Sequence, residues 1–572
     1  MASPDTSSKP ILSVRNLRFT YTDGERPALA SLTFDLSPGE LLAVMGASGA
    51  GKSTLCRCLN AIIPHFLKGQ LSGEVLLHGE SVADKRVADV ARNVGLVFQD
   101  FESQLFATNV ELEVAFAAES LGLPREDIAS RVQQLLSLVG LSHLAHRRPA
   151  SLSGGEKQRL AIAAALASAP SLVVFDEATS DLDPAGKSAV FELARRLRGP
   201  GVSNRAVVFA HHDAEEALRA SRLLLLSDGE PIALGPPQQV LASAERLAAH
   251  GVRPLATTSL CQALGIDEAP LEQEAAAEAL LERGFRISPQ ALADREAQDR
   301  ARAQSYGEPI VEVRDLTHSY ADSPPAVRHL SLTLRRGEYV AIIGQNGSGK
   351  TTLVKHFNGL LRPSSGQVLI AGEPTEKQSL RALGQRVGHV FQNPDHQIFA
   401  PTVFEEVSFA PRNFGLSADE VKARVSESVA AVGFTGREED DPFSLTKGER
   451  QRVAVASVLA GRPEVLIFDE PTTGLDYRES LGMMALIDQL NRRGHTIVLV
   501  THAMWLVAEY AHRVIAMQGG RVVLDAPTRA AFSRAEALRE AAIIPPQVVR
   551  LSHRLGGTAL TVPELVALLR PR

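Results

Sequence analysis

The stretch Gly46-Ala47-Ser48-Gly49-Ala50-Gly51-Lys52-Ser53 decides the fold of the first half of the chain, and Gly344-Gln345-Asn346-Gly347-Ser348-Gly349-Lys350-Thr351 repeats it in the second. Both fit G-x-x-x-x-G-K-[ST], the pattern of a phosphate-binding loop. Each follows an apolar run that predicts a strand (41–45 and 339–343) and runs into a predicted helix. The glycines let backbone N–H groups point at an anion, and the helix N-terminus adds partial positive charge. We therefore expect two phosphate sites.

The polar residues of each loop predict a nucleoside triphosphate with Mg²⁺. Lys52 and Lys350 can reach the β- and γ-phosphates, and Ser53 and Thr351 offer a hydroxyl to the metal ion. Thr54 and Thr352, which come next, are included among the nucleotide-binding residues.

A carboxylate pair follows a second apolar run in each half: Asp176-Glu177 after 172–175, and Asp469-Glu470 after 465–468. A buried strand can deliver the first carboxylate beside the phosphate loop, where it holds the Mg²⁺ shell. The second carboxylate is a candidate general base for an attacking water.

The chain is a tandem repeat. The pairs Lys52/Lys350 and Asp176/Asp469 are offset by 298 and 293 residues, so the first copy has about five extra residues, which we assign to 62–69. A near-constant offset over this length indicates two homologous domains. We predict a first domain at 10–255, a linker or helical extension at 256–307, a second domain at 308–525 and a C-terminal helical extension at 526–572.

Composition narrows the functional classes. The 572 residues exceed one core, and 44% apolar with 22% charged residues is typical of globular domains. A net charge of −6 gives no bulk electrostatic argument for nucleic acid, and three cysteines cannot build a disulfide framework. No apolar run approaches 18 residues and the N-terminus does not resemble a signal peptide. Any membrane association is therefore expected through partners only.

Apolar, strand-like runs alternate with Ala- and Leu-rich helical stretches in both copies, which predicts an α/β fold with a mostly parallel sheet covered by helices.

The order of motifs resembles the nucleotide-binding domain of ABC transporters. The phosphate loop is followed by Gln99, Leu152-Ser153-Gly154-Gly155-Glu156, Asp176-Glu177, Ser180-Asp181-Leu182-Asp183 and a downstream His. The second copy repeats this order with Gln392, Leu445-Thr446-Lys447-Gly448-Glu449, Asp469-Glu470, Thr473-Gly474-Leu475-Asp476 and His502. The resemblance implies two tandem ABC-type domains, each with a helical subdomain, and an ATPase coupled to transport.

In that family two domains close head to tail, so the resemblance implies that each ATP lies between the phosphate loop of one domain and the helix start of the other. Site one would combine Gly46–Ser53, Gln99, Asp176 and Glu177 with Leu445–Glu449. Site two would combine Gly344–Thr351, Gln392, Asp469, Glu470 and His502 with Leu152–Glu156. By the same resemblance Tyr21 and Tyr320 stack on adenine, and Gln99 and Gln392 join the Mg²⁺ ligands.

Two features of the motifs remain open. The wording His212-Asp213-Ala214-Glu215-Glu216 resembles the family's switch histidine, but the spacing to Arg222, compared with His502 to Arg513, selects His211. Lys447 stands where the family has Gly, so it either adds a cation for phosphate or obstructs closure. We hypothesise that the two sites hydrolyse ATP at unequal rates, with site two faster.

The segments after each Gln, 98–106 and 391–399, and the runs 108–116 and 402–409 are similar to energy-coupling factor (ECF) ATPases of vitamin, cobalt or nickel uptake. This resemblance implies a membrane-embedded T subunit, a substrate-binding S subunit and a peripheral location at the cytoplasmic face of the membrane. The alternatives are a fused ATPase of an ordinary solute-binding-protein-dependent importer, and a ribosome-associated ABC ATPase.

Overall fold

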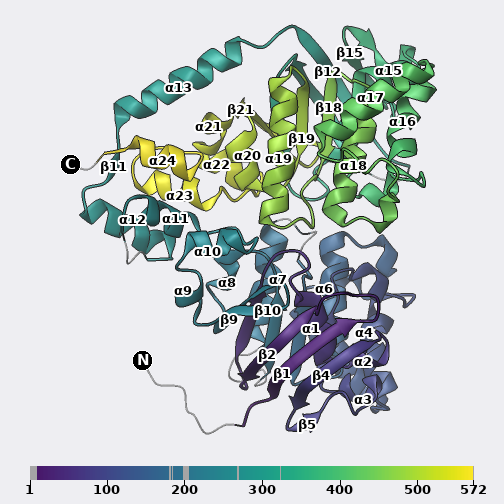
Figure 1. Ribbon diagram of the computed structural model, residues 1–572, viewed down its shortest axis with the longest axis vertical. Helices are drawn as coiled ribbons and strands as arrows, with labels where there is room; N and C mark the ends of the chain where they lie inside the picture. The colour runs from purple at the N-terminus through teal and green to yellow at the C-terminus, as the bar shows by residue number, and fades with distance from the viewer. Residues whose placement is uncertain are drawn as a thin grey trace. The chain divides into compact units, whose positions relative to one another are not determined.

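The computed structural model describes residues 9–179, 182, 184–197, 205–266, 270–321 and 324–570 (Figure 1). The chain divides into two compact units, Met1–Thr258 and Ser259–Arg572. Among the described residues, no helix has both the length and the apolar character needed to cross a bilayer.

The first unit is built on a six-stranded sheet of order β10-β9-β3-β8-β7-β6, in which only the β10–β9 pairing is antiparallel. Its inner strands are buried along their whole length, because helices cover both faces. The strands are β3 (Leu41–Met45), β6 (Val94–Val97), β7 (Leu172–Asp176), β8 (Ala206–Ala210), β9 (Arg222–Ser227) and β10 (Glu230–Gly235).

A four-stranded antiparallel sheet, β2-β1-β4-β5, packs beside it through one continuous apolar core. Its strands are β1 (Leu12–Tyr21), β2 (Leu29–Leu36), β4 (Gly69–Leu77) and β5 (Glu80–Ser81). The helices of this unit are α1 (Lys52–Leu59), α2 (Ile62–His65), α3 (Val87–Val90), α4 (Val110–Ser120), α5 (Arg125–Leu138), α6 (Gly154–Leu166), α7 (Pro184–Arg196), α8 (Ala214–Ala217), α9 (Pro237–Val240) and α10 (Ala244–Ala249). Helices α4, α5 and α6 pack on one another as a helical subdomain.

The second unit repeats this topology, with a six-stranded sheet of order β17-β18-β19-β14-β20-β21 and a four-stranded sheet of order β13-β12-β15-β16. The strands are β12 (Pro309–His318), β13 (Val327–Arg335), β14 (Tyr339–Ile343), β15 (Ser365–Ile370), β16 (Glu373–Pro374), β17 (Val387–Val390), β18 (Val465–Asp469), β19 (Thr496–Val500), β20 (Arg513–Gln518) and β21 (Arg521–Pro527). The helices are α14 (Lys350–Phe357), α15 (Leu380–Arg386), α16 (Val403–Asn413), α17 (Ala418–Ala431), α18 (Lys447–Leu459), α19 (Tyr477–Arg492) and α20 (Met504–Tyr510).

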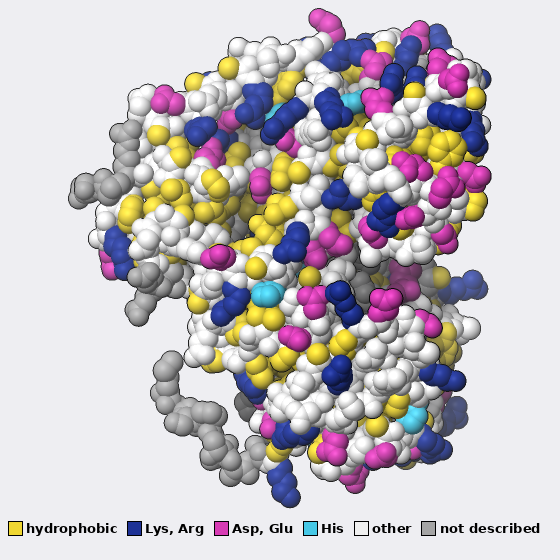
Figure 2. Space-filling model, in the orientation of Figure 1, with side chains coloured by type: hydrophobic (Ala, Val, Ile, Leu, Met, Phe, Trp, Pro, Cys, Tyr) yellow, Lys and Arg dark blue, Asp and Glu magenta, His cyan; other side chains and the backbone are white. Residues whose placement is uncertain are grey.

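These two layouts confirm the predicted α/β fold with mostly parallel sheets. Helix α2 lies in 62–69, the segment that the offset marked as extra in the first copy. The second unit passes from α14 to β15 through 358–364 without a helix. On the face drawn in Figure 2, basic and acidic side chains are interspersed over the surface of each unit.

The second unit also contains a small module built from two distant parts of the chain. Its β11 (Arg286–Ile287) pairs with β22 (Leu569–Arg570), and α12 (Gln273–Glu282) packs on α23 (Gln547–Arg554). Helix α13 (Pro289–Gln304) has no buried residue. Helix α11 (Ala256–Ala263) contains the point, after Thr258, at which the chain passes from the first unit to the second. The tail adds α21 (Thr528–Phe532), α22 (Ala535–Glu540) and α24 (Val562–Leu568), shown in yellow-green to yellow in Figure 1.

Buried Arg529 fastens this module together. Its guanidinium lies 2.7 Å from Asp299 of α13 and 2.6 Å from Glu564 of α24. The segment 256–307 and the tail 526–572, which the sequence treats as separate extensions, therefore fold against each other.

Candidate functional site

The predicted site residues of the first unit gather at one edge of its parallel sheet. Strands β3, β6, β7 and β8 run in the same direction, so the loops that follow them share the carboxyl edge. Ligands of open parallel sheets bind at this edge. The phosphate loop follows β3, Gln99 follows β6, Asp176 ends β7 and the paired histidines follow β8.

The phosphate loops of the two units have the same geometry. Lys52 Nζ donates to the carbonyls of Gly46 and Ala47 at 2.9 and 2.7 Å, and Lys350 Nζ donates to Gly344 and Gln345 at 2.8 Å each. Each lysine thus folds back over its own loop. The ammonium is held where it can meet an anion bound by the backbone N–H groups.

Glycine is required at the residue that caps each loop helix. Gly51 has φ of 101°, and a Cβ there would lie 2.4 Å from the carbonyl oxygen of Ala28. Gly349 has φ of 99° and the same 2.4 Å approach to Ala326. The left-handed backbone and the close approach both exclude a side chain.

The first carboxylate of each pair lies beside the loop hydroxyl. Ser53 Oγ donates to Asp176 at 2.7 Å, and the side chain of Thr351 is hydrogen-bonded to Asp469. Burial raises the pKa of Asp469 to about 6, with repulsion from Glu470 adding to the shift. Burial also raises the pKa of Asp176. A buried carboxylate with a raised pKa is a group that a cation would stabilise.

The second residue of each pair has a strained backbone, and its carboxylate is paired with a histidine. Glu177 and Glu470 both have φ of 49°, a left-handed conformation that is unusual for a residue with a side chain. His212 Nε2 lies 3.0 Å from Glu177, and His502 Nδ1 lies 2.8 Å from Glu470.

Electrostatics favour the ionised form of both glutamates. Burial alone would raise the pKa of Glu177, but attraction to His212 and Lys52 outweighs it and lowers the pKa below the usual value. Lys52 Nζ is 3.0 Å from this carboxylate. The pKa of Glu470 is lowered in the same way, against its burial, by His502, Lys350 and Thr501.

Strand register decides which histidine of the first unit corresponds to His502. Asp176 pairs with Ala210 in β8, and Asp469 pairs with Val500 in β19. The residues after these positions are His211 then His212, and Thr501 then His502. His212 is therefore the counterpart of His502. His211 is buried, its pKa is lowered to about 4 by that burial, and its ring nitrogen Nδ1 accepts the N–H of Asp213.

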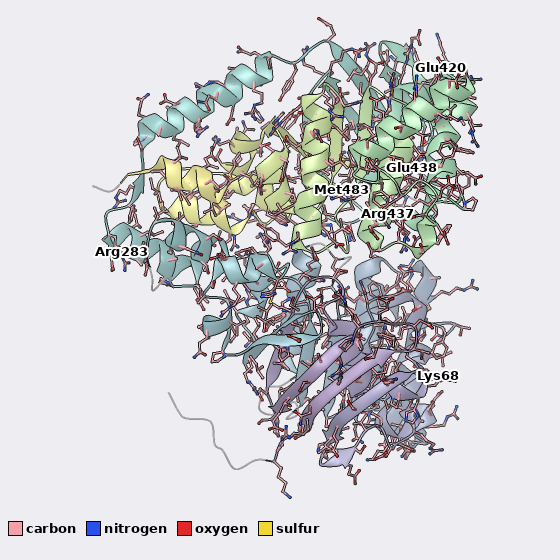
Figure 3. All side chains as sticks on the ribbon, viewed as in Figure 1. Lys68, Arg283, Glu420, Arg437, Glu438 and Met483 are labelled. Carbon is pink, nitrogen blue, oxygen red and sulfur yellow. The ribbon has the colours of Figure 1, made fainter. Side chains whose placement is uncertain are left out.

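The predicted helix starts both form capping boxes. The Ser153 hydroxyl and Glu156 cap α6 reciprocally, and Thr446 and Glu449 do the same for α18. Arg437, labelled in Figure 3, lies 2.7 Å from Glu449. The first helical residues, Gly154-Gly155 and Lys447-Gly448, leave their backbone N–H groups at the helix N-terminus.

Lys447 lies along the loop that follows the Asp469-Glu470 pair. A Cβ built on Gly474 would lie 2.5 Å from Lys447 Nζ. The absence of a side chain at Gly474 therefore leaves the space that the Lys447 side chain occupies. The corresponding residues Ser180, Asp181 and Asp183 of the first unit lie outside the described residues.

The other predicted residues fall close to these groups. Tyr21 and Tyr320 hydrogen-bond through their hydroxyls to Thr54 and Thr352 at 3.1 and 3.2 Å, so each tyrosine is tied to the loop helix. Gln99 and Gln392 are exposed and stand two residues beyond the ends of β6 and β17. The face-to-face arrangement of loops and helix starts from different units stays a prediction.

Sequence reasoning assigned no role to several residues behind the site. His318 and His356 form a buried pair beneath Tyr320, with 3.2 Å between their ring nitrogens. Glu113 and Glu406 are buried at the ends of the post-Gln segments. Glu113 stands in the run 108–116 that the sequence marked as distinctive, and its recurrence at an offset of 293 was the available signal.

Comparison with known proteins gives the family. The sequence profile described as "ABC transporter" matches residues 29–180 and 327–473. A relative from Caldanaerobacter subterraneus, named "Putative ABC transporter ATP-binding protein TTE1589", is 45% identical over 98% of this chain and 99% of its own. A protein of Methanosarcina acetivorans, named "Putative ABC transporter ATP-binding protein", is 37% identical over 98% of this chain and 93% of its own.

Among solved structures, cbiO1 from Clostridium perfringens, described as part of the ABC transporter complex cbiONQ, is 36% identical. It covers 41% of this chain and 94% of its own, with a TM-score of 0.38. The duplicated loops, carboxylates and capped helix starts agree with the profile and with the full-length relatives, and the chain belongs to the ABC transporter family as an ATP-binding protein with two tandem ATPase domains.

Proposed function

We propose that this chain is the energy-coupling ATPase of an ECF-type importer. Both of its ATP sites are formed within one chain, each from the phosphate loop of one unit and the capped helix start of the other. The duplicated arrangement of Lys52, Asp176 and Glu177 with Lys350, Asp469 and Glu470 supports two nucleotide sites.

The residues of each site have separate tasks in hydrolysis. Backbone N–H groups of the loop and the lysine ammonium hold the β- and γ-phosphates. Glu177 or Glu470 accepts a proton from water as the water oxygen bonds to the γ-phosphorus, and the bond to the β,γ-bridging oxygen breaks to give ADP and phosphate. His212 and His502, which lie within 3.0 Å of these carboxylates, orient them and contact the γ-phosphate.

Phosphate binding also readies the base. In the structure Lys52 Nζ lies 3.0 Å from Glu177 and lowers its pKa. ATP draws this ammonium toward its phosphates, which frees the carboxylate to accept a proton. The proton affinity of the Glu177 carboxylate therefore rises only when ATP is bound.

The oxygen ligands in each unit fit Mg²⁺. Ser53 with Asp176, and Thr351 with Asp469, supply the hydroxyl and carboxylate oxygens that Mg²⁺ prefers, and Gln99 and Gln392, two residues beyond the ends of β6 and β17, would add an amide oxygen each. Asp469 Oδ1 is buried without a hydrogen-bond partner among the described residues, which suits a ligand position. Mg²⁺ would neutralise charge on the β- and γ-phosphate oxygens.

The observation that carries the importer assignment is the surface after each Gln. Both units present an edge-on pair of exposed phenylalanines there, Phe106 with Phe116 at 4.7 Å and Phe399 with Phe409 at 4.8 Å. Two such surfaces fit two helices of a membrane-embedded T subunit. ATP-driven closure would then move these helices, and the T subunit would reorient an S subunit that holds the cargo. The chain would lie peripherally on the cytoplasmic face of the membrane.

The cargo is selected by the S subunit, so a vitamin, a thiamine precursor, cobalt and nickel are all compatible with this chain. The second candidate is a fused ATPase of an ordinary solute-binding-protein-dependent importer, which would use the same nucleotide sites. A ribosome-associated ATPase agrees least with the switch histidines His212 and His502.

Purification of the chain from membranes of its source cells tests the proposal. We expect one T-like and one S-like membrane protein to co-purify, with a small molecule bound to the latter. Co-purification of a paired permease with a solute-binding protein would select the second candidate. Sedimentation with ribosomes instead of membranes would overturn both.

A further inference from the structure

The segment that leads from each Gln to the phenylalanine pair is fastened in the same way in both units. Phe98 N donates to Gln104 Oε1 at 3.3 Å, and Phe391 N donates to Gln397 Oε1 at 3.1 Å. The glutamine side chain therefore closes a loop that begins beside the strand-end Gln99 or Gln392. Gln104 and Gln397 are structural parts of this loop.

An ion pair ties the middle of the segment to the helix whose start is capped. Lys157 of α6 lies 2.9 Å from Glu102, and Arg450 of α18 lies 2.8 Å from Asp395. In the second unit Gln397 also donates to Ala454 of α18 at 3.0 Å. Movement of α6 or α18 would thus carry the segment with it.

A buried glutamate holds the end of the segment. One oxygen of Glu113 accepts the N–H groups of Phe106 and Ala107 at 2.9 and 2.7 Å. One oxygen of Glu406 accepts those of Phe399 and Ala400 at 3.0 Å each. Both glutamates are only 3% exposed, and neither takes part in an ion pair within the part of the chain that the structure describes.

Burial of a carboxylate without a cation is costly, so its position calls for a reason. A carboxylate that accepts two backbone N–H groups makes stronger hydrogen bonds than a neutral acceptor does. The result at the surface is a fixed aromatic ring: Phe106 is 64% exposed and Phe399 is 59% exposed. The glutamates therefore fix the backbone from which these two exposed rings project.

We propose that Glu113 and Glu406 are positioning residues that set each phenylalanine pair as an anchor for an apolar helix of the membrane partner. The inference rests on the proposed function, in which these surfaces receive that partner. The occupant is a helix because each pair of exposed rings, 4.7 or 4.8 Å between centroids, forms one apolar anchor that a single apolar helix face can cover. The ion pairs to α6 and α18 link the same anchors to the helix starts that bind ATP.

The test compares four variants of the full chain expressed in its source cells: Glu113→Ala, the pair Phe106→Ala with Phe116→Ala, all three changes together, and Glu119→Ala as a control. Glu119 is exposed on the same helix α4. The readouts are the amount of integral membrane protein that co-purifies per chain in detergent, and the basal ATPase rate of the purified chain.

We expect Glu113→Ala to lower co-purification at least ten-fold while basal ATPase stays within two-fold of wild type. The triple variant should lose no more than the phenylalanine pair does, because the glutamate acts only through those rings. Glu119→Ala should behave as wild type. If Glu113→Ala lowers basal ATPase as well, Glu113→Gln is used in its place. Its amide oxygen still accepts the N–H groups of Phe106 and Ala107, so it should restore most of the co-purification.

Separate outcomes overturn separate statements. Full co-purification with Glu113→Ala, together with loss in the phenylalanine variant, would overturn the positioning role and leave the importer function standing. Full co-purification in the phenylalanine variant would overturn the docking surface, and the role of Glu113 with it. An additional ten-fold loss in the triple variant would show that the glutamate acts on partners by another route and would also overturn the inference.

Discussion

The two units have the same phosphate loops and carboxylate pairs, but the residues that pack behind Tyr21 and Tyr320 differ. In the first unit Phe19 packs edge-on against Tyr21 at 4.8 Å, and in the second His318 packs against Tyr320 at 4.9 Å with the same 82° between the rings. Cys58 and Leu96 of the first unit are replaced by His356 and His389 at the corresponding offsets of 298 and 293. Three apolar residues of the first unit, Phe19, Cys58 and Leu96, thus correspond to His318, His356 and His389 in the second. We call these three histidines the histidine floor, or the histidine network, of the second unit.

Hydrogen bonds join the histidines of this network to one another and to backbone carbonyls. His356 Nδ1 lies 2.8 Å from the carbonyl of Thr352, and its Nε2 lies 3.2 Å from His318 Nδ1, which is also 3.0 Å from the carbonyl of Arg362. Burial lowers the pKa of His356, which favours its neutral ring.

The signature positions differ too. The first copy has Gly154 where the second has Lys447, a side chain that lies across Gly474. The two phosphate loops have the same geometry, so the hypothesis of unequal sites rests on this difference at Lys447. The proposed pairing assigns Lys447 to site one, opposite Lys52 and Glu177.

The largest expected effect separates Glu470 from Glu177, the two candidate general bases. If site two carries most of the turnover, as the unequal-site hypothesis holds, Glu470→Gln should lower ATP turnover by about 10²-fold or more, the scale of a lost general base. Glu177→Gln should lower it less than three-fold. Steady-state ATPase of the purified chain measures both, and equal losses would contradict unequal sites.

An intermediate effect is expected at Lys447. In a Glu470→Gln background, where only site one turns over, Lys447→Gly should raise the remaining rate several-fold because it removes bulk from the helix start. Lys447→Arg is the matched control, since it keeps both bulk and charge. A fall in rate with Lys447→Gly would show that the cation helps bind phosphate.

The smallest effect concerns pH and the histidine floor. Burial lowers the pKa of His389 to about 4, so the folded second unit stays neutral there while an unfolded chain takes up a proton below about pH 6.5. Stability therefore falls as pH falls from 6.5 toward 4. His389→Leu, the residue of the first copy, should remove about 1–3 kcal/mol of this loss.

Denaturant unfolding of the second unit at pH 7 and pH 5 measures that change. The exposed residue His396 supplies the control, and His396→Leu should leave the pH dependence as it is in wild type. An unchanged pH dependence in His389→Leu would show that the histidine floor is not the source of the acid sensitivity.

Local sequence patterns were enough to predict the phosphate loop and the carboxylate pair of each unit. The phosphate loops and the Asp176-Glu177 and Asp469-Glu470 pairs follow apolar strands, and parallel strands bring their carboxyl ends to one edge. Strand register, which no spacing rule contains, was needed to choose His212. The reason is that the spacing changes by one residue here: His212 stands ten residues before Arg222, and His502 stands eleven before Arg513.

Contacts between distant residues could not be predicted. His318 and His356 stand 38 residues apart on different elements, and their pairing depends on how α14 packs on β12. Strands β11 and β22 have two residues each, too few for any alternation to show, yet they join the linker segment to the tail. The structural role of Glu113 could not be predicted either, because it depends on where the N–H groups of Phe106 and Ala107 lie.

The central claim is that each phosphate loop is completed by the helix start of the other unit, and a cysteine cross-link tests it most directly. The three native cysteines are buried, so Ser48→Cys with Thr446→Cys can be joined by a short bis-maleimide in a Glu177→Gln, Glu470→Gln background that retains ATP. The account predicts an ATP-dependent shift in gel mobility for this pair and none for Ser48→Cys with Ser153→Cys. Cross-linking of the second pair with ATP, and not of the first, would contradict it.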